Sequence, residues 1–210
     1  MLLTHWHHDH VGGIDQVLTL CPDATFSKYL PNDEEEYHPI RDGDEFAVEG
    51  GKVRAFHTPG HTTDHIVLYM DDTGILFTGD SILGQGTAVF ESLTTYVGSL
   101  KKQLNLNPTS LYPAHGPTID GPEAARQKIR EYIDHRQQRE DEIIKVMADH
   151  DVPVTAMDVV RVVYANYPQS LWLAAEKGVV LHLEKLKDEG KLKEAEHGKW
   201  VLIGRRGMSE

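Results

Sequence analysis

Short apolar runs separated by turn residues fill the first half of the chain and predict a β-sheet. The opening Met1-Leu2-Leu3 is typical of the end of a buried strand, and it leads into a polar loop over residues 4–13. Later apolar runs stop at turn signals, which predicts strands at 46–48, 53–56, 66–70, 75–77 and 110–112. Helical spacing of apolar residues predicts helices over 14–21 and 92–104. The first half therefore indicates an α/β fold.

A long helix is expected after Gly121. Pro122 suits a first-turn position, and apolar residues recur at helical spacing from Ala125 to Met147. We therefore divide the chain into a first domain over 1–120, a connecting helix over 121–150 and a small module over 151–210.

The small module has the outline of a winged-helix-like domain. Thr155 and Asp158 resemble a capping box before an apolar helix, and a second helix over 171–189 stops at Gly190 before a closing strand at 200–203. Two helices followed by a short two-stranded wing can bind DNA. This module holds nine basic and nine acidic residues, however, so packing or formation of a homodimer is the default expectation.

The acidic charge of the chain is concentrated in its first 150 residues. They hold 12 Lys and Arg against 24 Asp and Glu, which accounts for the whole net charge of −12. This half repels polyanions, which weighs slightly against a nucleic-acid substrate. The single Cys21 cannot form an intramolecular disulfide, and we expect it to be a small buried residue. No apolar run nears the roughly 20 residues that span a bilayer, and no signal peptide is recognisable, so we expect an intracellular, cytoplasmic protein without a membrane partner.

Thirteen histidines are the unusual feature of the composition, and four candidate ligands stand within six positions. His5 and His7 are two residues apart at the end of a strand, so they share one side. Asp9 and His10 follow at once and must point elsewhere. A single metal would not need four ligands so close together, so this spacing predicts two neighbouring metals, one at each pair.

Three more candidate ligands follow predicted strands. They are His61 in Thr58-Pro59-Gly60-His61, Asp80 in Thr78-Gly79-Asp80 and His115 in Pro113-Ala114-His115. Imidazoles and carboxylates without a thiolate suit zinc, with manganese or iron as alternatives. A lone His-x-His pair usually lies in a surface loop and binds nothing. Five histidines and two aspartates in this order, each after a predicted strand, are hard to explain as unrelated loop residues. His65 follows the His61 loop, where a histidine is more often a bystander than a support for a ligand.

On these residues the chain resembles the metallo-β-lactamase-fold hydrolases, whose His-x-His-x-Asp-His signature stands here at residues 5–10. The resemblance implies an αββα sandwich over 1–120 that holds two zinc ions. It implies that His5, His7 and His61 hold the first ion and that Asp9, His10 and His115 hold the second. It also implies that Asp80 bridges both ions and that Asp9 helps to orient the nucleophile, so Asp9 and Asp80 are the candidate catalytic residues. Two divalent ions that share a water supply hydroxide at neutral pH.

A narrower likeness concerns segments outside that signature. The stretch 79–87, the segment His135-Arg136-Gln137-Gln138-Arg139 and the segment 182–186 are similar to the lactamase-beta-like-2 branch, which appends a winged helix. That branch includes a single-strand-specific mitochondrial endoribonuclease and thioesterases that release polyketides from acyl carrier protein. In the family, several strands precede the metal signature, whereas this chain starts on it. We therefore expect the N-terminal strands to be missing, as in a truncated gene product. A mitochondrial location is open if a leader is missing too.

Three functional hypotheses remain at this point. The first is zinc-dependent hydrolysis of an acyl thioester, with a small thioester or acyl carrier protein as partner, and the acidic charge slightly favours it. The second is cleavage of single-stranded RNA. The third is a non-catalytic scaffold, which bound metal without turnover of any ester, thioester or RNA would favour.

Overall fold

The computed structural model describes residues 1–30 and 37–204. The chain divides into two compact units, Met1–Ile133 and Asp134–Glu210, which we describe separately. The long predicted helix, α4, spans Pro122–Ala148 and therefore contributes residues to both units.

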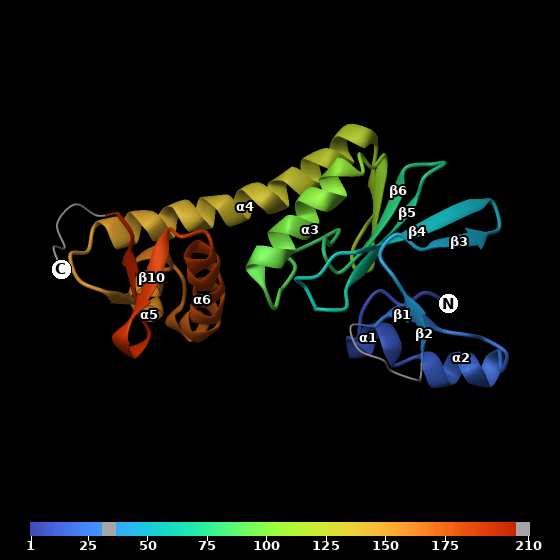
Figure 1. The fold of residues 1–210 in the computed structure, drawn as a ribbon, viewed down its shortest axis with the longest axis horizontal. Helices are drawn as coiled ribbons and strands as arrows, with labels where there is room; N and C mark the ends of the chain where they lie inside the picture. The colour runs from blue at the N-terminus through green and yellow to red at the C-terminus, as the bar shows by residue number, and fades with distance from the viewer. Residues whose placement is uncertain (31–36, 205–210) are drawn as a thin grey trace. The chain divides into compact units, whose positions relative to one another are not determined.

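A six-stranded mixed sheet is the centre of the first unit (Figure 1). Its strands in spatial order are β3 (Glu45–Val48), β4 (Gly51–His57), β5 (Ile66–Met70), β6 (Ile75–Gly79), β7 (Ser110–Pro113) and β8 (Ile119–Asp120). Neighbouring strands are antiparallel except β6 and β7, which are parallel. Helix α3 (Leu93–Asn105) occupies the connection between these two parallel strands, as is usual for such a crossover.

A second, smaller sheet packs against the first. It consists of β1 (Ser27–Tyr29) and β2 (His38–Ile40), which are parallel, and Leu2 bridges to Ser27 beside them. Ile40 of β2 forms an apolar cluster with Ala55 and Ile66 of the large sheet. This cluster joins the two sheets into the sheet-on-sheet core of the expected fold class.

Helix α3 (Leu93–Asn105) lies against the loop that follows β6. Ser92 caps its N-terminus by accepting a hydrogen bond from the Thr95 amide. On its buried face, the Tyr96 hydroxyl donates to the Ser81 carbonyl at 2.6 Å, and the Gln103 side chain accepts from the Ser81 hydroxyl at 3.2 Å. These contacts anchor the turn that immediately follows Asp80.

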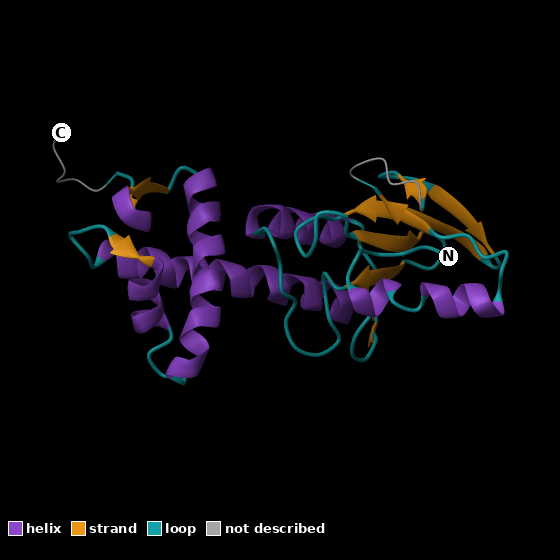
Figure 2. Ribbon diagram, turned by 90° about the horizontal axis from the view of Figure 1, so that it is seen from below, coloured by secondary structure: helices purple, strands orange, loops and turns teal. Residues whose placement is uncertain are grey.

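The second unit is mostly helical and carries a small three-stranded sheet (Figure 2). After the end of α4 come β9 (Val154–Thr155), α5 (Ala156–Val163), α6 (Trp172–Asp188), β10 (Leu192–Ala195) and β11 (Lys199–Leu202), with short 3₁₀ turns at Gln169–Leu171 and Glu196–Gly198. The predicted Thr155–Asp158 capping box is present. The wing differs from the prediction because β9 pairs with β11 as a third strand. Two residues are too few to give a strand pattern in the sequence.

Two local expectations were wrong. Cys21 is exposed, because α2 (Ile14–Leu20), which it follows, buries none of its residues. The polar loop over 4–13 contains a helical turn, α1 (His8–Val11), which carries Asp9 and His10. Among the described helices, none is both long enough and apolar enough to cross a membrane.

Candidate metal centre

The strand directions bring the candidate ligands to one edge of the large sheet. Strands β4 and β6 both pair antiparallel with β5, and β7 runs parallel to β6, so β4, β6 and β7 point the same way. Their C-terminal ends lie at one edge, and His61, Asp80 and His115 follow these three ends. The segment from His5 to His10 meets them there, as the distances below establish.

The first group of ligands consists of His5, His7, His61 and Asp80. The Nε2 atom of His61 lies 3.2 Å from Nε2 of His5 and 3.1 Å from Nδ1 of His7. The Oδ2 atom of Asp80 lies 3.8 Å from Nε2 of His61 and 4.0 Å from Nε2 of His5. All of these residues except the half-buried His7 are buried, so the group is shielded from water.

The second group consists of Asp9, His10, Asp80 and His115. The Oδ1 atom of Asp80 lies 3.5 Å from Nε2 of His10 and 3.5 Å from Nε2 of His115. The Oδ2 atom of Asp9 lies 3.1 Å from Nε2 of His115 and 3.5 Å from Nε2 of His10. Asp9 and His115 are exposed, so this group faces solvent and can be reached from outside.

Each group fits a divalent cation. The ligand atoms of a group all lie within 4.8 Å of one another, and four atoms held tetrahedrally at about 2.1 Å from zinc would lie about 3.4 Å apart. The buried His10 Nε2 and Asp80 Oδ1 atoms have no hydrogen-bond partner among the described residues, as expected for atoms that face a cation. Asp80 turns one oxygen to each group, which suits a shared carboxylate.

Burial and neighbouring charges hold two of these residues in their ligating states near neutral pH. Burial of the ring, reinforced by the imidazoles of His10 and His61, lowers the pKa of His5 to about 3. Burial acts to raise the pKa of Asp80, but its close approach to His10 outweighs this and brings the pKa to about 2. A neutral imidazole and an ionised carboxylate are the forms that bind metals.

Hydrogen bonds on the far side of two rings fix their orientation. Nδ1 of His61 donates to the Val89 carbonyl at 2.7 Å, which leaves the Nε2 lone pair for the first group. Nδ1 of His5 lies 3.1 Å from the Thr4 hydroxyl. Gly60, at φ +133°, lets the loop before His61 pass against α3, because a Cβ there would lie 2.3 Å from the Tyr96 Cα.

The structure adds supporting residues that the sequence analysis did not identify. Val89 acts through its backbone carbonyl, which leaves no side-chain signal. A buried ion pair joins Lys28 of β1 to Asp64 of the His61 loop at 3.1 Å, and its only sequence signal was an acidic residue in a polar loop. His65, which the sequence analysis treated as a bystander, accepts a hydrogen bond from the Asp80 amide at 3.1 Å.

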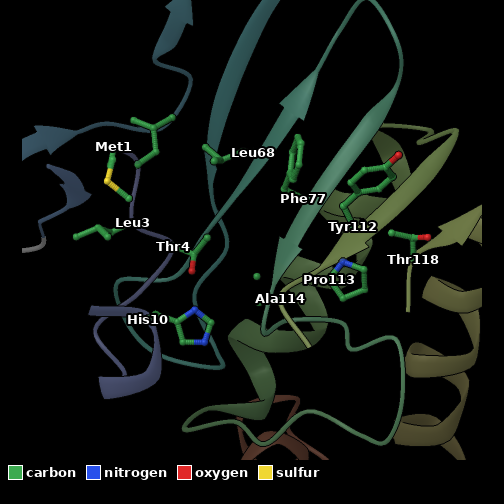
Figure 3. A pocket seen from close by; sticks show the side chains of 12 residues that line it. Met1, Leu3, Thr4, His10, Leu68, Phe77, Tyr112, Pro113, Ala114 and Thr118 are labelled. Atoms are coloured by element: carbon green, nitrogen blue, oxygen red, sulfur yellow. The ribbon is translucent and has the colours of Figure 1, made fainter. Parts of the chain in front are cut away.

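A cavity of about 480 Å³ reaches the second group of ligands (Figure 3). Leu68, Phe77 and Tyr112 line it from three neighbouring strands of the large sheet, and Leu3 lines it from the N-terminal segment. His10 also faces this cavity, which places apolar surface next to a candidate ligand.

The comparisons with known proteins assign the family. The metallo-beta-lactamase superfamily matches residues 1–115, and the beta-lactamase associated winged helix domain matches residues 155–200. The chain therefore belongs to the metallo-beta-lactamase superfamily and ends in the winged helix associated with it. The fold and family that the sequence analysis predicted are confirmed.

Similar proteins include a beta-lactamase-like protein 2 homolog from Drosophila melanogaster, 45% identical over 92% of this chain and 70% of the relative. An atrochrysone carboxyl ACP thioesterase from Aspergillus fumigatus is 39% identical over 70% of this chain and 34% of the relative. The crystal structure of a metallo-beta-lactamase family protein from Thermus thermophilus is 25% identical, with a TM-score of 0.63 over 80% of this chain. The chain spans about half of that protein, 55% of its length.

Proposed function

We propose that the chain forms a dinuclear zinc-dependent hydrolase that acts on an acyl thioester. The observation that supports it most is Asp80, whose two oxygens face two separate groups of histidine and aspartate ligands. In this proposal His5, His7 and His61 hold one ion, Asp9, His10 and His115 hold the other, and Asp80 contacts both. Manganese or iron would fit the same ligand types, and zinc is our choice because imidazoles predominate.

When bound, the two ions supply Lewis-acid polarisation of the scissile carbonyl and an activated water at neutral pH. The residues of the chain supply orientation and access. The hydrogen bond from His61 Nδ1 to Val89 keeps that ring's proton away from the centre. The exposed Asp9 carboxylate stands at the open side, where it can accept a hydrogen bond from the attacking water and orient it.

A thioester is our first choice of substrate for two reasons. One relative is named as an atrochrysone carboxyl ACP thioesterase. The first 150 residues carry the whole net charge of −12, which disfavours phosphate-rich single-stranded RNA, the alternative substrate. An acyl carrier protein is accordingly the partner we propose.

The test combines metal analysis with turnover of both substrates by one preparation. After zinc reconstitution we expect close to two zinc ions per chain, hydrolysis of an acyl thioester and poor cleavage of single-stranded RNA. Asp9→Ala serves as the blank for a contaminating nuclease. Efficient RNA cleavage that this variant abolishes, without thioester turnover, would replace the thioesterase by the ribonuclease. Two bound ions without any turnover would favour a non-catalytic scaffold.

A further inference from the structure

A fully buried imidazole lies directly behind the carboxylate that both ligand groups share. The ring of His65 is not exposed at all, and its centroid lies 5.3 Å from that of His5 and 5.6 Å from that of His61. It belongs to neither ligand group. Its Nε2 atom instead accepts a hydrogen bond from the backbone amide of Asp80 at 3.1 Å.

The opposite ring nitrogen has a partner that completes the arrangement. Nδ1 of His65 lies 2.9 Å from the hydroxyl oxygen of Thr58. Because Nε2 accepts from an amide, the single proton of the neutral ring must be on Nδ1, so Nδ1 donates to Thr58. The amide of Thr58 in turn donates to the His65 carbonyl at 2.8 Å, which ties the two ends of the His61 loop together.

The turn that carries Asp80 fits closely against this ring. Gly79 has φ +51°, and a Cβ at this position would lie 2.7 Å from Nε2 of His65. The backbone of the turn thus approaches the imidazole as closely as a glycine permits. Because the amide of Asp80 is held on one side by His65, its side chain leaves the turn on the other side, toward the ligands.

We propose that His65 is a positioning residue, which holds the Asp80 backbone so that the carboxylate oxygens face one ligand group each. This inference rests on the proposed function. A carboxylate that serves two cations must satisfy two sets of distances at once, so a small rotation of the turn weakens both sites. Buried hydrogen-bond partners behind a ligand act in this way, and their loss costs about 10- to 100-fold in metal affinity or activity.

The test compares His65→Leu with His65→Gln. Glutamine has an amide oxygen that can reach the position of Nε2 and accept from the Asp80 amide, whereas leucine has no acceptor. His38→Leu, on an exposed position of β2, is the matched control for loss of a histidine. The measurements are zinc affinity by competition with a chelating indicator and the visible absorption spectrum of the cobalt-substituted protein. Urea unfolding of the metal-free form measures stability separately.

We expect His65→Leu to bind zinc about 10- to 100-fold more weakly and to change the cobalt spectrum. His65→Gln should stay within about threefold of the parent, and His38→Leu should match it. If His65→Leu lowers stability but keeps the parent's affinity and spectrum, the ring is only structural and the inference is wrong. If His65→Leu does not fold, Thr58→Val removes the Nδ1 partner, and unchanged affinity in that variant overturns the inference.

The failure of the proposed function gives a different result. A parent protein that binds two zinc ions but turns over neither substrate would contradict the hydrolase, while the affinities of the His65 variants would still decide the positioning role. A parent that hydrolyses its substrate, with affinities unchanged in His65→Leu, would contradict the positioning role alone.

Discussion

Asp80 is the residue on which the two ligand groups depend, since its oxygens lie 3.5–4.0 Å from four different imidazoles. Its replacement should therefore disturb both groups, whereas loss of any one of the five ligand histidines disturbs one group. We expect Asp80→Ala to reduce the zinc content well below two ions per chain. Its loss of activity should exceed the roughly 10- to 100-fold expected for a supporting residue such as His65. Elemental analysis and turnover measurements on Asp80→Ala and a His65 variant test this. Equal losses of activity would mean that Asp80 is not shared between the two ligand groups.

Gly60 makes a second prediction at the scale of the residue. It has φ +133°, and any Cβ there would lie 2.3–2.5 Å from backbone and side-chain atoms of Tyr96. Gly60→Ala should cost roughly 2 kcal/mol or more of unfolding free energy, because both strain and overlap must be relieved. Gly98 lies within α3 with no atom within 4 Å of its Cβ position, so Gly98→Ala should be neutral or up to about 1 kcal/mol stabilising. Urea unfolding compares them, and equal effects would contradict the close approach at Gly60.

At the scale of the element, the sequence predicted those strands, helices and caps that show a periodic apolar pattern or a turn signal. The strands over 66–70 and 110–112, the helix over 92–104 and the Thr155–Asp158 capping box were all found close to their expected places. The two-residue strands were not predicted, because they are too short to show a period. The backbone partner of His61, the Val89 carbonyl, depends on a contact across 28 residues that no local pattern reports.

The interface between α4 and α6 leads to a pH prediction. His182 of α6 is buried, with Nδ1 3.7 Å from the buried Glu140 carboxylate of α4. Lys185 of α6 pairs with Glu140 at 3.0 Å. Burial, only partly offset by Glu140, lowers the pKa of His182 below 6.5. The positive charges of Arg136 and Arg139 of α4 also lower the pKa of His182. The unfolded chain therefore takes up a proton more readily than the folded one, so stability present above pH 6.5 is lost as pH falls toward the folded pKa.

The measurement is urea unfolding of the second unit between pH 7 and pH 5. Of the three tryptophans, Trp172 and Trp200 lie in this unit, so a Trp6→Phe background makes fluorescence specific to it. We expect the free energy of unfolding to fall as the pH is lowered, and to fall more steeply in the parent than in His182→Gln. The difference between the two slopes should be at most about 1.4 kcal/mol per pH unit. Identical pH slopes would show that His182 does not titrate differently on folding.

At the scale of the whole molecule, the order of ligands along the chain was more informative than composition. Five histidines and two aspartates could be assigned to two groups from their spacing and from the family resemblance, because each follows a strand end. The supports behind them, such as His65 and the Lys28–Asp64 pair, could not be assigned, since they become neighbours only once the loops fold. Composition contributed the excess of histidines and the distribution of charge, and the charge bears on the substrate.

The charge distribution predicts how salt affects turnover. An enzyme that neutralises about four phosphates of single-stranded RNA loses roughly 50-fold in affinity between 50 and 200 mM salt, because counterions are released on binding. The acidic residues 1–150 offer no excess of basic side chains for such contacts. We therefore expect kcat/KM for a small acyl thioester to change by less than about threefold over this range. An acyl carrier protein would add some surface electrostatics and a steeper dependence, which the small substrate isolates. If the protein instead cleaves RNA with a steep salt dependence, and Asp9→Ala abolishes that cleavage, the substrate is a polyanion. The same candidate ligands would then serve to activate the water.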